Sequence, residues 1–148
     1  MLKKVAIITA VLFLFGSTNL FASTIAIKDA QNLVQNAVTL IKTDGTKKAF
    51  QQINYGDDFT QQEIYVFVID NEGTYIASGG GLISQIGKNF IDIKDLNGFN
   101  FIEEITRIKT KGIVSYKWPN PYTGKEATKI AYIMRVDDYL VGAGVYKN

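Results

Sequence analysis

Alternation of polar with apolar or aromatic residues marks the last quarter of the chain. Three such runs occupy 112–118, 127–136 and 139–146. The first break contains two prolines and a glycine, and the second is the pair Asp137-Asp138, so both breaks hold residues whose backbone preferences favour a turn. The pattern predicts a three-stranded antiparallel meander.

Helical spacing of apolar residues characterises the beginning of the chain. Between Thr24 and Thr43 the apolar positions fall on one stripe, which predicts a helix of about 20 residues that covers one face of a sheet. Asp44-Gly45 is expected to end this helix. Thr46 is expected to cap a second, shorter helix that reaches about Ile53.

The middle of the chain predicts a hairpin, a loop and a third helix. The segment 63–70 is apolar on both faces, as in a central strand, and 74–78 returns as its partner. Three glycines at 79–81 open a loop through about Asp95, and apolar residues at helical spacing follow over 98–110. The predicted fold class is α+β, with a five-stranded antiparallel sheet and a long N-terminal helix packed on it.

Several motifs in order carry a family resemblance. They are Asp70 to Gly98 (DNEGTYIASGGGLISQIGKNFIDIKDLNG), then Tyr116-Lys117-Trp118-Pro119, Gly124-Lys125, Lys129 with Tyr132, and Gly142 to Tyr146 (GAGVY). From about Ile25 to the C-terminus the chain resembles a single Cache domain of the small type, an extracytoplasmic sensor module of bacterial chemoreceptors and sensor kinases. The resemblance implies a PAS-like layout, in which the hairpin joins the meander across the sheet.

The N-terminus has the order of a secretory signal peptide. Two lysines precede an apolar run from Val5 to Phe15, and small and polar residues follow. We expect residues 1–22 to be removed, with Ala26 as the other plausible cleavage position, and 23–148 to form one domain in the periplasm. The rival interpretation is a retained membrane anchor. The eleven-residue run is shorter than the roughly 20 residues that a membrane span needs.

Composition narrows the chemistry. The chain has no His and no Cys, which removes most nucleophiles, bases and transition-metal ligands, and it excludes disulfides and a lipid-anchored cysteine. Basic residues number 16 and acidic residues 14, and loss of Lys3 and Lys4 with the signal leaves 14 of each. Such a balanced chain has no electrostatic footprint for nucleic acid. We expect no cofactor and no metal site.

Lys129 is the central candidate for ligand contact. It shares a strand face with Ala131 and Ile133, so its ammonium group needs either an exit to solvent or an anion, and the bare sequence leaves both open. Only one face of the sheet can hold the N-terminal helix. The space between the other face and the loop 79–97 is expected to form a small-molecule cavity. The resemblance implies that Lys129 lies at that pocket.

Aromatic residues complete the expected ligand-binding set of Tyr75, Tyr116, Trp118, Lys129 and Tyr132. Tyr116 and Trp118 share one strand face, where they either pack in the core or line the pocket. The resemblance pairs Tyr132 with Lys129, whereas strict alternation places these two residues on opposite faces. Gly142 and Gly144 leave a strip without side chains that admits a packed helix or a ligand. Ser78 stands where many relatives have His, which puts the family's ligand range in doubt here.

The resemblance implies a module that binds a short organic acid, of the acetate, propionate, pyruvate or lactate class. Such a module would signal through a membrane partner, either a chemoreceptor or a sensor kinase. The rival hypothesis is an interaction module without a ligand, whose sheet or helix surface docks onto a receptor or forms a homodimer. An enzyme is disfavoured because the chain is poor in groups for acid and base catalysis.

Overall fold

The computed structural model describes residues 18–147, with side chains described from Ala26 onward. The expected signal peptide lies largely outside these residues. The elements in chain order are α1 (Thr18–Asp44), α2 (Thr46–Tyr55), β1 (Thr60–Gln61), β2 (Ile64–Asp70), β3 (Tyr75–Ser78), the 3-10 turn η1 (Ile83–Gln85), α3 (Phe101–Thr106), β4 (Lys111–Pro119), β5 (Glu126–Val136) and β6 (Tyr139–Lys147).

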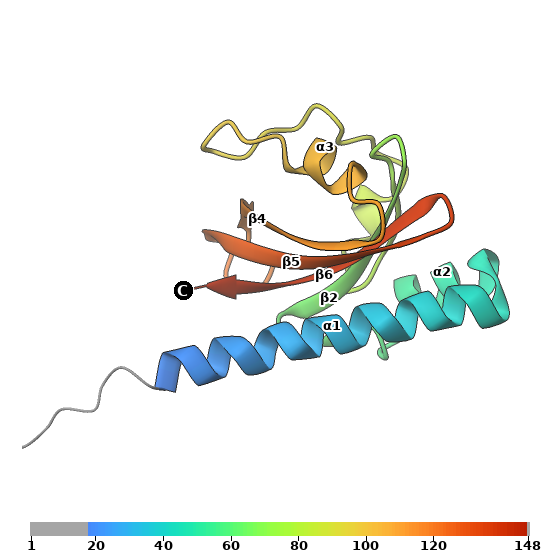
Figure 1. Ribbon diagram of the computed structural model, residues 1–148, viewed down its shortest axis with the longest axis horizontal. Coiled ribbons are helices and arrows are strands. Elements are labelled where there is room, and N and C mark those ends of the chain that lie inside the picture. Colours follow the sequence, from blue (N-terminus) through green and yellow to red (C-terminus); the bar gives the residue numbers. More distant parts are fainter. Residues whose placement is uncertain (1–17, 148) are drawn as a thin grey trace, which may run out of the picture.

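The sheet is antiparallel and joins the hairpin to the meander. Its order is β1-β2-β6-β5-β4, and β3 pairs with β2. Strand β2 therefore lies between its hairpin partner β3 and the last strand, β6, as the family resemblance implied (Figure 1). The two-residue strand β1 pairs with β2 and was not predicted. Strand β4 is at the other end of the sheet, paired with β5 alone.

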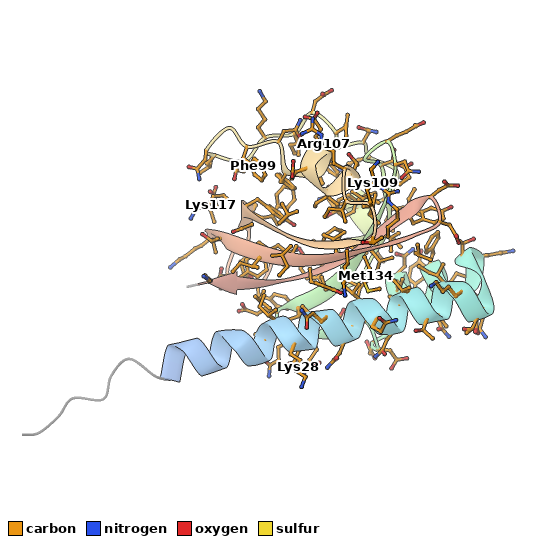
Figure 2. The ribbon with its side chains drawn as sticks, in the orientation of Figure 1. Lys28, Phe99, Arg107, Lys109, Lys117 and Met134 are labelled. Carbon is orange, nitrogen blue, oxygen red and sulfur yellow. The ribbon has the colours of Figure 1, made fainter. Side chains whose placement is uncertain are left out.

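Helix α1 covers one face of the sheet, and the predicted stripe forms the contact (Figure 1). Its buried residues pack on β2, β5 and β6, and Met134 of β5 points toward the helix (Figure 2). The helix begins at Thr18, upstream of the expected Thr24, and so it runs through both expected cleavage positions. The buried residues of the stripe are Ala30, Leu33, Val34, Ala37, Val38 and Ile41.

The opposite face carries a second apolar core under α3 and the loop 79–100 (Figure 1). Side chains of the sheet, α3 and the loop pack against one another where the small-molecule cavity was expected. The loop is held at both sides of the sheet. Asn89 bridges to Thr74 beside β3, and the Asp95 carboxylate accepts the backbone N–H of Lys117 in β4 at 3.0 Å. The buried residues of this second core are Phe67, Ile69, Tyr75, Phe101, Ile102, Ile105, Val114, Tyr116, Ala131, Ile133 and Leu140.

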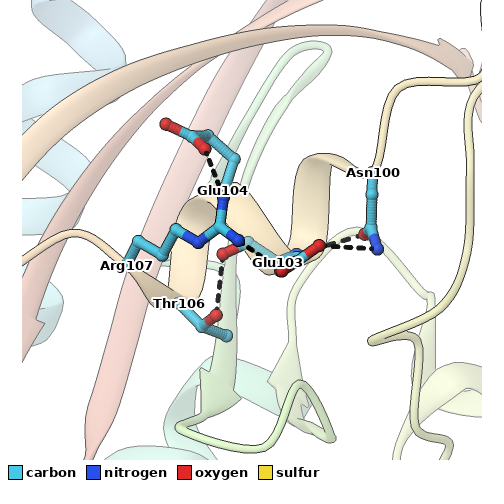
Figure 3. A network of polar contacts seen from close by, with 5 residues as sticks. All are labelled: Asn100, Glu103, Glu104, Thr106 and Arg107. Atoms are coloured by element: carbon cyan, nitrogen blue, oxygen red, sulfur yellow. Dashed lines mark hydrogen bonds and ion pairs between the residues drawn. The ribbon is translucent and has the colours of Figure 1, made fainter.

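Helix α3 is shorter than the predicted 98–110. Asn100 caps its start by accepting the Glu103 N–H, and Arg107 pairs with Glu103 and Glu104 on its outer side (Figure 3). Arg135 of β5 donates to the carbonyl oxygens of Thr106 and Ile108, both at 2.8 Å. These contacts satisfy carbonyl groups at and just after the C-terminal end of α3. The helix therefore ends at Thr106, and the chain continues toward β4.

The start of α2 also differs from expectation. Gly45, with φ of 81°, occupies the N-cap position of α2 without a side-chain cap, so Thr46 is the first residue of the helix rather than its cap. Among residues 18–147, no helix is long and apolar enough to cross a membrane.

Candidate functional site

Lys129 lies on the face of the second core, as its alternation with Ala131 and Ile133 predicted. Its side chain is only 1% exposed, and it is among the largest fully buried side chains of the described chain. A lysine is almost never this buried unless its ammonium group has a compensating partner. The sequence left open either an exit to solvent or an anion for the Lys129 ammonium group. In this conformation the group has no exit to solvent.

Gly144 makes room for this side chain. A Cβ atom at Gly144 would lie 2.7 Å from Cε and 2.9 Å from Cγ of Lys129. Gly144 pairs with Ala131 of β5, so the lysine stem leans across β6 toward β2. The strip without side chains at Gly142 and Gly144 thus accommodates three core side chains, because a Cβ at Gly142 would meet Phe67 at 2.3 Å and Ile133 at 2.6 Å.

Aromatic rings and hydroxyl groups surround the ammonium group. Lys129 Nζ donates a hydrogen bond to the Tyr65 hydroxyl at 2.8 Å and lies 4.0 Å from the centre of the Tyr65 ring. The ring centres of Phe67 and Tyr146 are at 5.2 and 5.3 Å. The hydroxyl groups of Tyr65 and Tyr146 are 3.2 Å apart, and the second reaches the Pro119 carbonyl at 3.4 Å. Ring faces attract cations, but they do not neutralise charge.

No carboxylate pairs with Lys129 within the described residues. The ion pairs of that part of the chain join Lys48 to Asp44, and Arg107 to Glu103 and Glu104. Burial lowers the pKa of the Lys129 ammonium group from 10.5 to about 7. Burial likewise raises the pKa of the Tyr65 hydroxyl, and it raises that of Tyr146 to about 12, so both hydroxyl groups stay protonated at neutral pH. At neutral pH the amine of Lys129 is therefore only partly charged, and a bound anion would stabilise its charged form.

Three of the expected site residues lie on the same face as Lys129. Tyr116 stacks on Phe101 with ring centres 4.1 Å apart, and Trp118 packs edge-on against Phe101 at 5.2 Å. Tyr75 is buried and stacks on Phe67 at 5.9 Å. Phe67 also neighbours the Lys129 ammonium group, so these aromatic residues extend from the site into the second core.

Tyr132 lies on the other face of the sheet and does not join Lys129. It packs against the core beneath α1 and lines a groove that the α1 residues Gln31, Asn32 and Gln35 border. The expected pocket on the loop side therefore does not include Tyr132. Strict alternation along β5, with no bulge in its pairing to β4 or β6, is the physical reason.

Sequence reasoning missed Tyr65 and Tyr146. Tyr146 pairs directly with Lys129 in the register of β5 and β6. Counting residue pairs outward from the Asp137-Asp138 turn could therefore have found it. Tyr65 comes from β2, which joins the meander through β6. Its position depends on a register between segments some 80 residues apart, and no local pattern reports that register.

The sequence matches the family model described as Single Cache domain 2 over residues 13–148. Over 98 residues it is also 33% identical to the sensor histidine kinase MctS of Rhizobium johnstonii. That alignment covers 64% of this chain and 20% of the kinase, so the chain spans about a fifth of the length of this relative.

Solved sensor domains share the fold. A methyl-accepting chemotaxis protein from Vibrio parahaemolyticus superposes with a TM-score of 0.68 at 23% identity, covering 86% of this chain and 91% of that one. A Cache chemosensory domain described for carboxylic acid recognition superposes with a TM-score of 0.62 at 20% identity, covering 88% and 94%. A periplasmic sensor domain of a chemotaxis protein gives 0.64 at 18% identity, covering 88% and 96%.

Proposed function

Because the chain belongs to the single Cache domain 2 family, we propose that it is a sensor module that binds a short organic acid at Lys129. The observation that carries the proposal is the buried ammonium group of Lys129, which has no carboxylate partner among residues 26–147. A bound carboxylate would supply the missing negative charge through a charge-assisted hydrogen bond. The chemosensory domain with the same fold is described for carboxylic acid recognition, which supports this ligand class.

The surroundings of Lys129 favour a ligand with one negative charge. Lys129 is the only charged residue among the buried side chains of the described chain, and its neighbours are rings and hydroxyl groups. Arg135, six residues further along β5, donates to carbonyl oxygens at the end of α3. A second carboxylate would face rings and no cation. Acetate, propionate, pyruvate and lactate each carry one carboxylate, which matches this single cation.

The bound state would pass to a membrane partner, either a chemoreceptor or a sensor kinase. Lys129 contacts Tyr65 of β2 and lies against Tyr146 of β6, so a ligand would act on two central strands of the sheet at once. With residues 1–22 removed as a signal peptide, the module would work in the periplasm. It would report the ligand without carrying out chemistry.

Calorimetric titration with the four acids tests the proposal. At least one acid should bind. Lys129→Ala should weaken the binding of that acid by about 1.5–3 kcal/mol, or about 10- to 150-fold in Kd. Lys125→Ala is the matched control, because Lys125 is exposed in the turn between β4 and β5. Equal affinities for wild type and Lys129→Ala, with the fold intact by circular dichroism, would overturn the assignment of Lys129.

The second candidate is an interaction module that binds no small molecule. One observation favours it: apolar side chains of the sheet, α3 and the loop 79–100 pack against one another where the pocket was expected. For this candidate, none of the acids changes the melting temperature at millimolar concentration. For the sensor, the binding acid raises the melting temperature with concentration.

A further inference from the structure

A groove lies on the helix side of the sheet, far from the Lys129 face. It has a volume of about 530 Å³ and forms where α1 stops covering the sheet, between that helix and the edge strand β4. One wall consists of the α1 side chains Gln31, Asn32 and Gln35, and the floor holds Tyr132. Ile113 of β4 lines the groove and is 58% exposed.

The outer edge of β4 has unpaired backbone groups. The Lys117 N–H points away from β5, since it donates to the Asp95 carboxylate. In an antiparallel strand the same holds for every second residue, so Ile113 and Ser115 also direct N–H and C=O groups outward. Within residues 18–147, β4 pairs with β5 alone, and the outward groups of these two residues make no hydrogen bond. Such an edge is a template for another strand.

Lysines are the charged residues of the strand at this edge. Lys111 is the one charged residue that lines the groove. On the helix side of β4 the residues are Lys111, Ile113, Ser115 and Lys117, none of them acidic. Lys109 precedes the strand and, like Lys117, is labelled in Figure 2. The acidic residue that approaches this edge, Asp95, is already engaged with three backbone N–H groups.

We propose that the edge of β4 between Lys111 and Ser115 binds an extended acidic segment of a partner protein as an added strand. The outward groups of Ile113 and Ser115 would form the ladder, while the lysines attract the acidic side chains. A second copy of this chain fits less well, because its own segment 111–117 carries two lysines and no acidic residue in any register. Two β4 strands paired about a two-fold axis near Val114 would place Lys111 opposite Lys117, and like charges directly opposite each other are destabilising.

The probe is the capped peptide Glu-Val-Glu-Val-Glu-Val-Glu, added to the full chain and followed by amide NMR and hydrogen exchange. Saturation should slow exchange of the Ile113 and Ser115 amides by about tenfold or more, because the added strand protects them. The same peptide with Lys for Glu should leave exchange unchanged. Lys111→Glu should weaken binding of the acidic peptide by about fivefold, which corresponds to the usual contribution of one surface charge pair.

Ile113→Pro tests the backbone hydrogen bonds to the added strand separately from the charges. It removes one outward N–H and leaves the bonds to β5, because those come from alternate residues. It should abolish peptide binding, whereas Ile113→Ala, which keeps the N–H, should bind within about threefold of wild type. If Ile113→Pro unfolds, Lys111→Glu and the exchange data on wild type decide the matter. No protection by the acidic peptide, equal protection by the basic one, or protection that depends on protein concentration alone would overturn the proposal.

Discussion

The Cε atom of Lys129 lies 2.7 Å from the point that a Cβ atom would occupy at Gly144. Any larger residue at position 144 would therefore displace the lysine stem from β6. The ammonium group reaches the Tyr65 hydroxyl on β2 because the strand between them carries no side chain at this point. Gly144 thus determines where the buried charge lies.

Gly144→Ala should both destabilise the fold and weaken acid binding. The added methyl group overpacks a buried site, which costs about 1–3 kcal/mol of unfolding free energy. Displacement of Lys129 from Tyr65 should lower ligand affinity as well. Gly112→Ala is the control, because its Cβ would meet the flexible end of Ile108 at 3.1 Å. Urea unfolding and calorimetry of both variants give the comparison. Equal effects in the two would show that Gly144 has no special role.

Lys129→Met should stabilise the unliganded protein while abolishing acid binding. Methionine keeps an unbranched stem but removes a buried charge that no carboxylate pairs with in the described chain. Replacing buried ionic groups by apolar ones of similar volume is often neutral or stabilising, by up to about 1–4 kcal/mol. Denaturant unfolding without ligand measures this change in unfolding free energy. A variant that loses both stability and binding would mean that the lysine serves the fold instead.

The unfolding free energy of the unliganded protein should rise with pH from about 7 toward 10. Burial lowers the pKa of Lys129 from 10.5 to about 7, so in this window the unfolded chain binds more protons than the folded one. Near pH 10 the trend should reverse, because burial raises the pKa values of Tyr65, Tyr75 and Tyr116 and the folded chain then holds more protons. Melting temperatures between pH 6 and 9 provide the measurement. Lys129→Met should lack this rise, and an equal rise in that variant would assign it to another group.

Tyr65→Phe and Tyr132→Phe should differ in their effect on acid binding. The Tyr65 hydroxyl touches the Lys129 ammonium group, whereas Tyr132 is on the α1 side of the sheet. Removing the first hydroxyl should weaken binding by about 0.5–1.5 kcal/mol, the usual contribution of one hydrogen bond. Removing the second should leave affinity unchanged. Calorimetry on both variants decides, and a loss restricted to Tyr132→Phe would place the ligand in the groove beside α1.

Local patterns in the sequence predicted most of the fold. Alternation located the three strands of the meander, and helical spacing located the stripe of α1, because both depend on residues close together in the chain. The same rule placed Lys129 and Tyr132 on opposite faces. The length of α3 escaped prediction, since its end depends on carbonyl contacts from Arg135, which comes from a strand 29 residues beyond Thr106.

The composition of the site was predictable only in part. Alternation placed Tyr116 with Trp118 on one face of their strand, and Lys129 with Ala131 and Ile133 on one face of the next. The register between β4 and β5 brings the two sets to the same side of the sheet. The packing of α3 on this face could not be foreseen, because it depends on contacts between separate elements, such as that of Phe101 with Tyr116. Tyr65 was missed for the same reason: its contact with Lys129 requires the register between β2 and β6.

The most direct test of the central claim is a crystal structure of the protein with its tightest-binding short acid, grown near pH 6, where Lys129 is protonated. The account predicts a carboxylate oxygen within hydrogen-bond distance of Lys129 Nζ, with the Tyr65 and Tyr146 hydroxyl groups beside it. A carboxylate bound elsewhere, with the contact between Lys129 and Tyr65 unchanged, would contradict it.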